Sequence, residues 1–106
     1  MNLDSAQNNY KLTVTGYTGD AGDALTLRHN GQAFTTYDQD NDPWSSGNCA
    51  ERFKGGWWYQ TCHDSNLNGL PDLGTNTTSG EGIEWTKWLD PYSLRAVAMK
   101  IRPQVN

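Results

Sequence analysis

The two cysteines constrain this chain more than any other feature of its sequence. Cys49 and Cys62 lie within the stretch from Thr36 to Gly69, which also holds three of the five tryptophans. A zinc site could recruit both thiolates together with His63, but zinc motifs usually bring cysteines in closely spaced pairs. A disulfide is therefore favoured, and closing a loop of this size contributes about 3 kcal/mol in the chain-entropy model. Disulfides persist in oxidising compartments, so we expect a secreted protein.

Length and composition exclude several classes of function. A chain of 106 residues forms one domain, and the apolar weight sits in five Trp, five Tyr and two Phe. The net charge is -4, and no basic cluster is present to face a phosphate backbone, so nucleic acid is not an expected partner. No apolar run reaches membrane-spanning length and no signal sequence is recognisable, so Met1 is interpreted as a start placed before a mature or truncated segment.

The first third of the chain predicts short strands. Residues 1–9 are polar and are expected to be a flexible lead-in. Apolar and polar residues alternate over 10–17, which predicts a half-buried strand with Tyr10, Leu12 and Val14 on one face. The Asn30-Gly31 pair between two alternating runs predicts a β-hairpin over 24–37. His29 lies beside the predicted turn and is expected to be solvated.

The remaining chain predicts long loops with few regular elements. A short helical turn is expected over 49–53, and short strands over 57–60 and 94–101. An apolar segment at 83–88 follows a long stretch rich in Asn, Gly, Pro, Ser and Thr. The predicted fold class is α+β, with a small twisted antiparallel sheet and long ordered loops that carry a calcium site and one disulfide.

The densest carboxylate cluster precedes the first cysteine. Asp38, Asp40 and Asp42 alternate along the chain, and carboxylates one residue apart in irregular backbone suit a hard divalent cation. An EF-hand is disfavoured, because the sixth position from Asp38 is Pro43 instead of glycine and the twelfth is Cys49. The alternative is that these side chains only solvate a turn.

Several motifs occur together and in order along the chain. They are Tyr37-Asp38-Gln39-Asp40-Asn41-Asp42, Gly47-Asn48-Cys49-Ala50, Gly56-Trp57-Trp58-Tyr59, Cys62-His63 and Ser65-Asn66-Leu67-Asn68-Gly69. With them, residues 10–106 resemble the C-terminal half of the fibrinogen C-terminal (fibrinogen-related) domain, of the ficolin and tachylectin kind. The resemblance implies a truncated domain made of a sheet and a binding subdomain.

The resemblance implies a calcium ion and a ligand pocket beside it. The carboxylates of Asp40 and Asp42 would bind Ca²⁺, with carbonyls around Trp44 and Ser46 or Gly47. The pocket floor would be the Thr61-Cys62 peptide bond, in the cis form, with amides turned outward to hold an acetyl carbonyl. The residues that match the pocket walls are Phe53, Tyr59, His63 and Ser79.

The function implied is a calcium-dependent, lectin-like module for acetylated carbohydrates of the N-acetylglucosamine type. Ser79 replaces a tyrosine that usually closes the pocket, so binding is expected to be weak unless several copies act together. One alternative is a fibrin-type pocket for a peptide amine, but Phe53 and Gly80 stand where that chemistry wants carboxylates. A structural fragment with an idle pocket is the other alternative, and an enzyme is disfavoured. A homo-oligomer formed through exposed strands is also possible.

Overall fold

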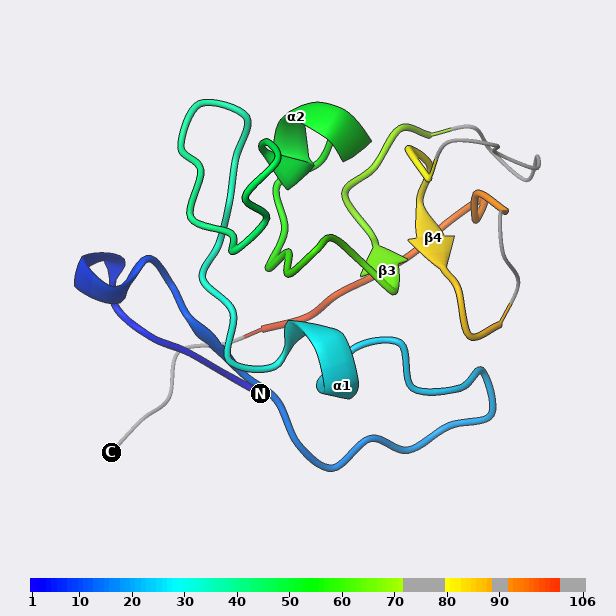
Figure 1. Ribbon diagram of the computed structural model, residues 1–106. Coiled ribbons are helices and arrows are strands. Elements are labelled where there is room, and N and C mark those ends of the chain that lie inside the picture. Colours follow the sequence, from blue (N-terminus) through cyan, green and yellow to red (C-terminus); the bar gives the residue numbers. More distant parts are fainter. Residues whose placement is uncertain (72–79, 89–91, 102–106) are drawn as a thin grey trace.

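Short regular elements separated by long loops make up the fold (Figure 1). The structure is a computed structural model that describes residues 1–71, 80–88 and 92–101. Ser79 and the possible glycosylation sequon at Asn76 lie outside the described residues. The elements in chain order are β1 (Asn2–Leu3), η1 (Ala6–Asn8), β2 (Leu12–Thr13), α1 (Thr26–His29), α2 (Cys49–Phe53), β3 (Ser65–Asn66) and β4 (Glu84–Trp85).

The strands form two separate antiparallel pairs. β1 pairs with β2 so that Leu3 lies opposite Leu12, and β3 pairs with β4 so that Asn66 lies opposite Glu84. The predicted class, with short antiparallel strands and one disulfide, is confirmed, although the predicted single sheet is divided into two pairs. Residues 1–9, expected to be a lead-in, contain β1 and η1.

The predicted hairpin over 24–37 is wrong. The Asp23 carboxylate accepts hydrogen bonds from the amides of Leu25 and Thr26, at 3.0 and 2.9 Å, and this turn leads into α1 instead of a strand. Gly31 has a φ of +84° and donates its amide to the Leu12 carbonyl, so the Asn30-Gly31 pair ends a helix and returns the chain toward β2. On the returning side, Thr35 pairs with Trp57 in an isolated bridge.

The other strand predictions hold only in part. The strand predicted over 10–17 shortens to β2, because Tyr10 has a φ of 55° and is 51% exposed, although Leu12 and Val14 are buried as expected. The strand predicted over 57–60 reduces to the bridge at Trp57. The strand predicted over 94–101 is absent from that described segment, because no neighbouring strand lies there to pair with it. The helical turn predicted at residues 49–53 is confirmed as α2.

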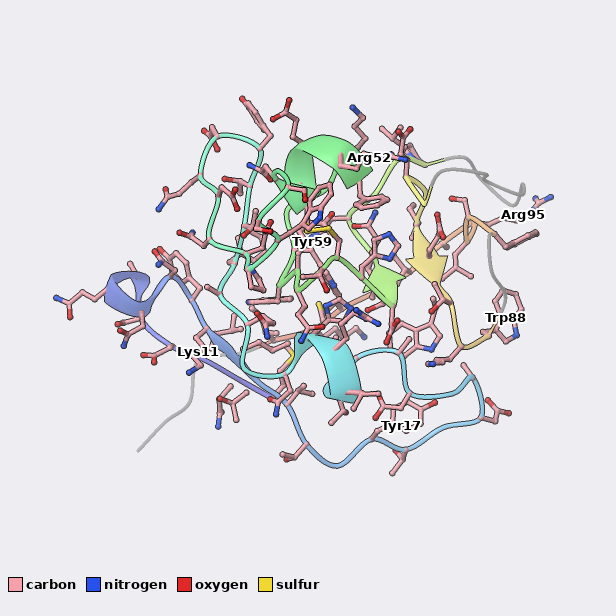
Figure 2. All side chains as sticks on the ribbon, in the orientation of Figure 1. Lys11, Tyr17, Arg52, Tyr59, Trp88 and Arg95 are labelled. Carbon is pink, nitrogen blue, oxygen red and sulfur yellow. A yellow bond between two sulfur atoms is a disulfide. The ribbon has the colours of Figure 1, made fainter. Side chains whose placement is uncertain are left out.

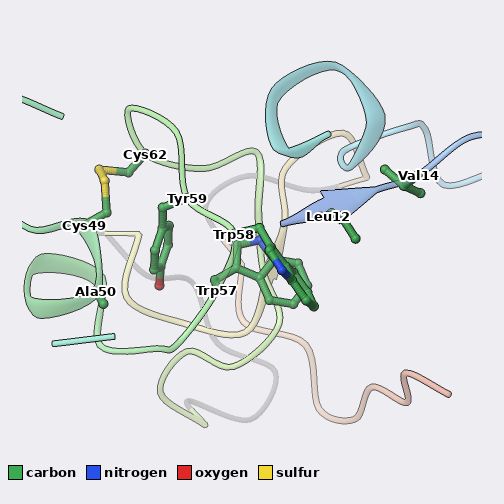
Figure 3. Close-up of a cluster of buried hydrophobic side chains, with 8 residues drawn as sticks. All are labelled: Leu12, Val14, Cys49, Ala50, Trp57, Trp58, Tyr59 and Cys62. Carbon is green, nitrogen blue, oxygen red and sulfur yellow. A yellow bond between two sulfur atoms is a disulfide. The ribbon is translucent and has the colours of Figure 1, made fainter. Parts of the chain in front are cut away.

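The core is an aromatic cluster next to the disulfide. Figure 3 shows the Cys49–Cys62 bridge at one end of this cluster and Leu12 and Val14 at the other. Trp57 and Trp58 are buried between them in an edge-to-face contact, so this pair has a structural role in the core. Other side chains reach the periphery, as Figure 2 shows for Lys11 and Tyr17. Among the described residues, no helix is long and apolar enough to cross a membrane.

Candidate functional site

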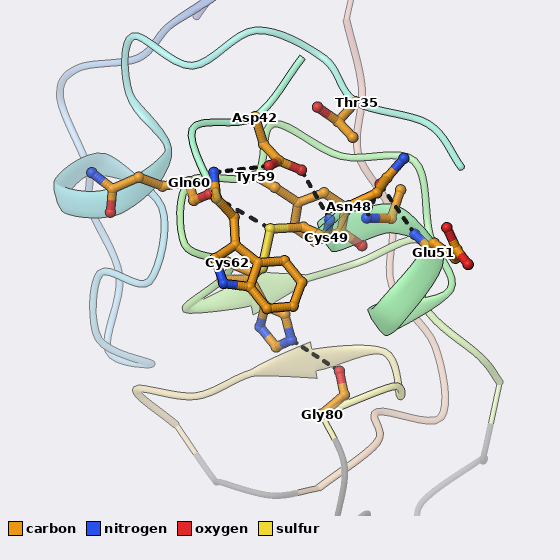
Figure 4. Close-up of a disulfide and its surroundings, with 12 residues drawn as sticks. Thr35, Asp42, Asn48, Cys49, Glu51, Tyr59, Gln60, Cys62 and Gly80 are labelled. Atoms are coloured by element: carbon orange, nitrogen blue, oxygen red, sulfur yellow. Dashed lines mark hydrogen bonds between the residues drawn. A yellow bond between two sulfur atoms is a disulfide. The ribbon is translucent and has the colours of Figure 1, made fainter. Parts of the chain in front are cut away.

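The N-terminus of α2 is capped by a side chain that also holds the preceding loop. Asn48 Oδ1 accepts hydrogen bonds from the amides of Ala50 and Glu51, at 2.8 and 3.2 Å, and satisfies two donors that the helix leaves open. Its Nδ2 donates to the carbonyls of Thr36 and Tyr37. We call residues 38–48, which carry Asp38, Asp40 and Asp42, the acidic loop. One asparagine therefore fixes the acidic loop to the helix that begins at the disulfide (Figure 4).

The predicted disulfide is confirmed. Cys49 and Cys62 are bonded, with their Cα atoms 5.6 Å apart, and both residues are buried. The bond consumes both thiols, so the zinc alternative is wrong. Figure 4 shows the bond linking the start of α2 to the segment that carries His63. The bridge therefore joins the acidic loop and the predicted ligand-binding segment into one unit.

The acidic loop turns back on itself through Asp42. Its carboxylate accepts hydrogen bonds from the amides of Trp44 (3.0 Å) and Cys49 (2.9 Å). Asp40 Oδ1 in turn accepts the Asp42 amide at 3.2 Å, while Asp38 accepts the Thr36 hydroxyl. Asp40 and Asp42 are thereby brought together, and Asp38 is directed elsewhere.

The electrostatics of the acidic loop favour a cation. Partial burial raises the pKa of Asp42, the two backbone amides oppose this shift, and the nearby Asp40 carboxylate adds to it. The exposed Asp40 carboxylate and the partly buried Asp42 carboxylate repel each other, and a cation relieves that repulsion. In the described ranges, no three His, Cys, Asp or Glu side chains group as a metal site. An ion here would therefore need backbone carbonyls in addition to the carboxylates.

Two of the predicted pocket residues, Phe53 and His63, meet at one place beside Gly80. The rings of Phe53 and His63 are in edge-to-face contact with centroids 4.9 Å apart, and His63 Nε2 lies 2.9 Å from the Gly80 carbonyl oxygen. A Cβ on Gly80 would lie 3.1 Å from Phe53 and 3.3 Å from His63, and its φ of +76° also favours glycine. Arg52 covers the Phe53 ring at 4.7 Å and forms an ion pair with Glu81 at 3.2 Å.

The backbone next to this cluster has the predicted form. The Thr61-Cys62 peptide bond is cis, and the Gln60 amide donates to the Cys62 carbonyl across it. Thr61 is exposed and Cys62 is buried, so the peptide lies at the surface with its sulfur turned inward. Tyr59, by contrast, is buried, and burial raises the pKa of its hydroxyl. Tyr59 lies on the buried side of the Phe53–His63 cluster and does not form a solvent-facing wall of the predicted pocket.

Asn66 is a buried residue whose side chain holds the elements around this cluster together. Its Nδ2 lies 3.0 Å from the Phe53 carbonyl oxygen, 3.4 Å from that of Gly80 and 3.3 Å from that of Gly82. Its Oδ1 is 2.6 Å from the Tyr59 hydroxyl. Asn66 therefore fixes the end of α2 to the turn that faces His63. Its place in the Ser65-to-Gly69 motif was the available signal, but sequence alone does not show which asparagine of that motif is buried.

A separate apolar hollow of about 510 Å³ lies on another part of the surface. It is lined by Asp20, Ala21, Leu67, Trp85, Trp88, Leu94, Val97 and Ala98. None of the predicted pocket residues lines it. Trp85 is fixed there because its Nε1 donates to the Gly22 carbonyl at 2.6 Å.

Comparison with protein families identifies the family to which this fold and site belong. The family model described as "Fibrinogen beta and gamma chains, C-terminal globular domain" matches residues 1–104. This chain belongs to that family. The match includes the acidic loop, the disulfide and the Phe53–His63–Gly80 cluster, and it begins ahead of the resemblance that starts at Tyr10.

The relatives of this fibrinogen-related chain are much longer than the chain itself. It is 48% identical over 102 residues to Fibrinogen C domain-containing protein 1 of Macaca fascicularis, covering 95% of this chain and 23% of that protein. It is 50% identical over 95 residues to Techylectin-5A of Tachypleus tridentatus, covering 89% of this chain and 32% of that protein. The chain thus spans a third or less of these relatives.

A solved structure shows the same fold. The lamprey fibrin D-dimer, complexed with the peptide Gly-His-Arg-Pro-amide, aligns with a TM-score of 0.75 and 32% sequence identity. The alignment covers 88% of this chain and 35% of the fibrin chain. The proteins similar to this chain therefore include one named as a lectin and one whose solved structure holds a peptide ligand.

Proposed function

We propose that this chain is a calcium-dependent, lectin-like recognition module that binds acetylated carbohydrates of the N-acetylglucosamine type. The observation that carries the proposal is the meeting of Phe53, His63 and the Gly80 carbonyl beside the cis Thr61-Cys62 peptide. An aromatic face next to backbone groups suits an acetyl group, whose methyl is apolar and whose carbonyl accepts hydrogen bonds. The similarity to Techylectin-5A supports a lectin.

In the proposed pocket, the amides of Cys62 and His63 hold the acetyl carbonyl, and the rings of Phe53 and His63 enclose its methyl group. The ion pair between Arg52 and Glu81 fixes the outer edge of Phe53. Ser79, the remaining predicted wall residue, lies outside the described residues. Tyr59 and Asn66 hold the cluster in place from the interior.

The acidic loop is the proposed calcium site. Asp40 and Asp42 would supply carboxylate oxygens, and Trp44, Ser46 and Gly47 would supply carbonyls from the following turn. Both Asp42 oxygens already accept an amide, but each carboxylate oxygen has two lone pairs and can also bind an ion. Calcium would supply a positive charge that holds the loop in one conformation next to the disulfide.

A peptide-binding function is the second candidate, because the lamprey fibrin structure holds a peptide ligand. A peptide amine needs an available carboxylate in the pocket. Glu81 is the acidic residue next to Gly80, but its carboxylate is paired with Arg52 at 3.2 Å. This pairing favours the acetyl-binding proposal.

Because disulfides persist in oxidising compartments, we further propose an extracellular location. We also propose that neither nucleic acid nor a membrane is a partner and that the chain has no enzymatic activity.

Calorimetric titration tests the proposal directly. N-acetylglucosamine, glucose and a free-amine peptide would be titrated against the chain, each with calcium and with chelator. We expect N-acetylglucosamine to bind only with calcium, with a dissociation constant of about 1 mM, as for a shallow pocket. Equal binding of glucose would reject acetyl recognition, and preferential binding of the peptide would support the second candidate.

A matched pair of variants tests the calcium site. Asp40→Asn should abolish the rise in melting temperature on adding calcium, because it removes a ligand charge. Asp38→Asn is the control, since Asp38 is directed to the Thr36 hydroxyl, and it should retain the rise. If calcium stabilises both variants equally, the ion does not bind at Asp40.

A further inference from the structure

The guanidinium of Arg52 lies between two groups at the outer edge of the proposed pocket. Its Cζ is 4.7 Å from the centroid of the Phe53 ring, over the face of that ring, and its Nη1 is 3.2 Å from Glu81 Oε1. An aromatic face and a carboxylate each attract a cation, so together they form a cation subsite. In this chain the subsite is filled by a side chain of the protein itself.

Helix geometry alone does not bring Arg52 over the Phe53 ring. Consecutive residues of a helix project about 100° apart, so their side chains do not normally face each other. Glu81 lies 29 residues further along the chain, and its carboxylate draws the guanidinium across the ring. Figure 2 shows Arg52 at the edge of the molecule beside α2. The position of the guanidinium therefore depends on the tertiary fold.

Both walls of the subsite are held by contacts that do not involve Arg52. The Phe53 carbonyl accepts a hydrogen bond from the Asn66 side-chain amide at 3.0 Å. The Glu81 carbonyl accepts the Leu70 amide at 2.6 Å, which fixes the backbone that carries the carboxylate. Removal of the guanidinium should therefore leave the aromatic face and the carboxylate in place.

The charges around this place favour a cation over an anion. The chain has a net charge of -4, with 8 Lys and Arg against 12 Asp and Glu. The Arg52 side chain is 46% exposed, but its charge is offset by Glu81, so it presents little net positive charge to a ligand. An acidic ligand would gain little here, whereas a ligand with an amine would have to displace Arg52.

We propose that Arg52 is a specificity-determining residue, which fills the cation subsite made by Phe53 and Glu81 and so excludes ligands with a free amine from the pocket. Such an amine would meet the positive guanidinium and would find the Glu81 carboxylate already paired. A neutral acetyl group meets neither cost. The preference for acetylated ligands rests on the proposed function, whereas the existence of the cation subsite does not.

Chemical rescue of Arg52→Ala tests the subsite itself. Methylguanidinium reproduces the head group of the missing side chain, so it should bind between Phe53 and Glu81. A nuclear magnetic resonance titration should then shift the Phe53 ring signals in Arg52→Ala, and not in the parent, whose subsite is filled. Adding Glu81→Gln to the variant should abolish the shift. No shift in Arg52→Ala, or an equal shift in all three proteins, would overturn the proposal.

Titration with two matched sugars tests the effect on selectivity. N-acetylglucosamine and glucosamine differ by one acetyl group, and the amine of glucosamine is mostly protonated at about pH 6. The affinity of Arg52→Ala for glucosamine should be about fivefold higher than that of the parent, because Phe53 and Glu81 become available to the ammonium at a partly exposed site. An unchanged affinity for glucosamine would overturn the role of Arg52 in excluding amines.

Lys54→Gln is the matched control for charge. Lys54 directly follows Phe53 and is exposed, and its replacement changes the net charge of the chain by the same amount as Arg52→Ala. The gain in affinity for glucosamine should therefore be absent from Lys54→Gln. An equal gain in both variants would assign the effect to net charge and would overturn the subsite.

The two experiments separate this proposal from the proposed function. If neither the parent nor Arg52→Ala binds N-acetylglucosamine, the proposed function fails, and the methylguanidinium titration still tests the subsite. If N-acetylglucosamine binds but methylguanidinium does not shift the Phe53 signals of Arg52→Ala, the proposed function stands. The contact between Arg52 and Glu81 is then an ordinary surface ion pair, and the further proposal is overturned.

Discussion

Two regions of this fibrinogen-related chain are ordered in different ways. Residues 49–66 have little sequence periodicity, yet they contain most of the core, the disulfide and the site. Residues 92–101 alternate well over most of their length, yet Val97, Met99 and Ile101 are 42%, 40% and 63% exposed. This described segment is joined to the rest of the chain near its start, where the Leu94 amide donates to the Ile83 carbonyl.

The difference shows what orders a chain with so little regular structure. In residues 49–66, buried polar side chains replace the hydrogen-bond ladder of a sheet. His29 and Asn66 each bond three backbone groups, six in all. The alternating pattern of residues 92–101 favours a strand, but a strand also needs a neighbouring strand to pair with. Hydrogen bonds from buried side chains to the backbone, rather than sequence periodicity, therefore mark residues 49–66 as the better-packed region.

The largest expected effect on stability comes from removing the Cys49–Cys62 disulfide within residues 49–66. Replacing Cys49 and Cys62 together by serine should lower the free energy of unfolding by about 2 to 5 kcal/mol, because the unfolded chain gains freedom. Denaturant unfolding of the variant, and of the parent with and without reductant, measures this loss. A change below 1 kcal/mol would show that the hydrogen-bonded network holds the region without the bridge.

The next effect is the acid sensitivity that His29 gives to the whole fold. Its pKa is about 4 when folded and 6.5 in the reference state, so the unfolded chain binds the proton more readily between these values. The free energy of unfolding should therefore fall as pH falls from 6.5 to 4, by about 3 kcal/mol at about 1.4 kcal/mol per pKa unit. Melting temperatures of the parent and His29→Gln over this range give the comparison, and parallel curves would contradict it.

Two asparagines in the same motif sharpen the comparison further. Asn66→Ala should cost about 2 kcal/mol, because it leaves buried carbonyls of Phe53 and Gly82 without a donor. Asn68→Ala is the matched control, since Asn68 is exposed and its side chain donates to the Gly56 carbonyl at the surface, and it should cost about 0.5 kcal/mol. Equal costs measured by denaturant unfolding would contradict the assignment of Asn66 as the interior link.

The sequence predicted the local features around the disulfide better than the path of the backbone. The disulfide and α2 were expected from the residues, the cis Thr61-Cys62 bond was implied by the family resemblance, and the structure has all three. The hairpin over 24–37 failed because the Asn30-Gly31 signal is local, whereas the Asp23 carboxylate starts a helical turn just before it.

The burial of His29 could not be predicted because its partners lie far along the chain. Trp58 and Asp64 are 29 and 35 residues from it, and their approach depends on the tertiary fold. A polar residue next to an apparent turn is usually solvated, and nothing local distinguishes this one. The same holds for Asn66, whose three acceptors come from two segments, at Phe53 and at residues 80–82.

The smallest expected effect lies in the alternating region. Val97→Ser should change the free energy of unfolding by less than about 0.5 kcal/mol, because Val97 is already 42% exposed. The same change at Val14, which is buried, should cost about 2 kcal/mol through lost apolar burial. If the two variants lose the same stability, then the 92–101 face is covered in solution. Sedimentation at several protein concentrations would then identify a second copy of the chain as the cover, because its effect would weaken on dilution.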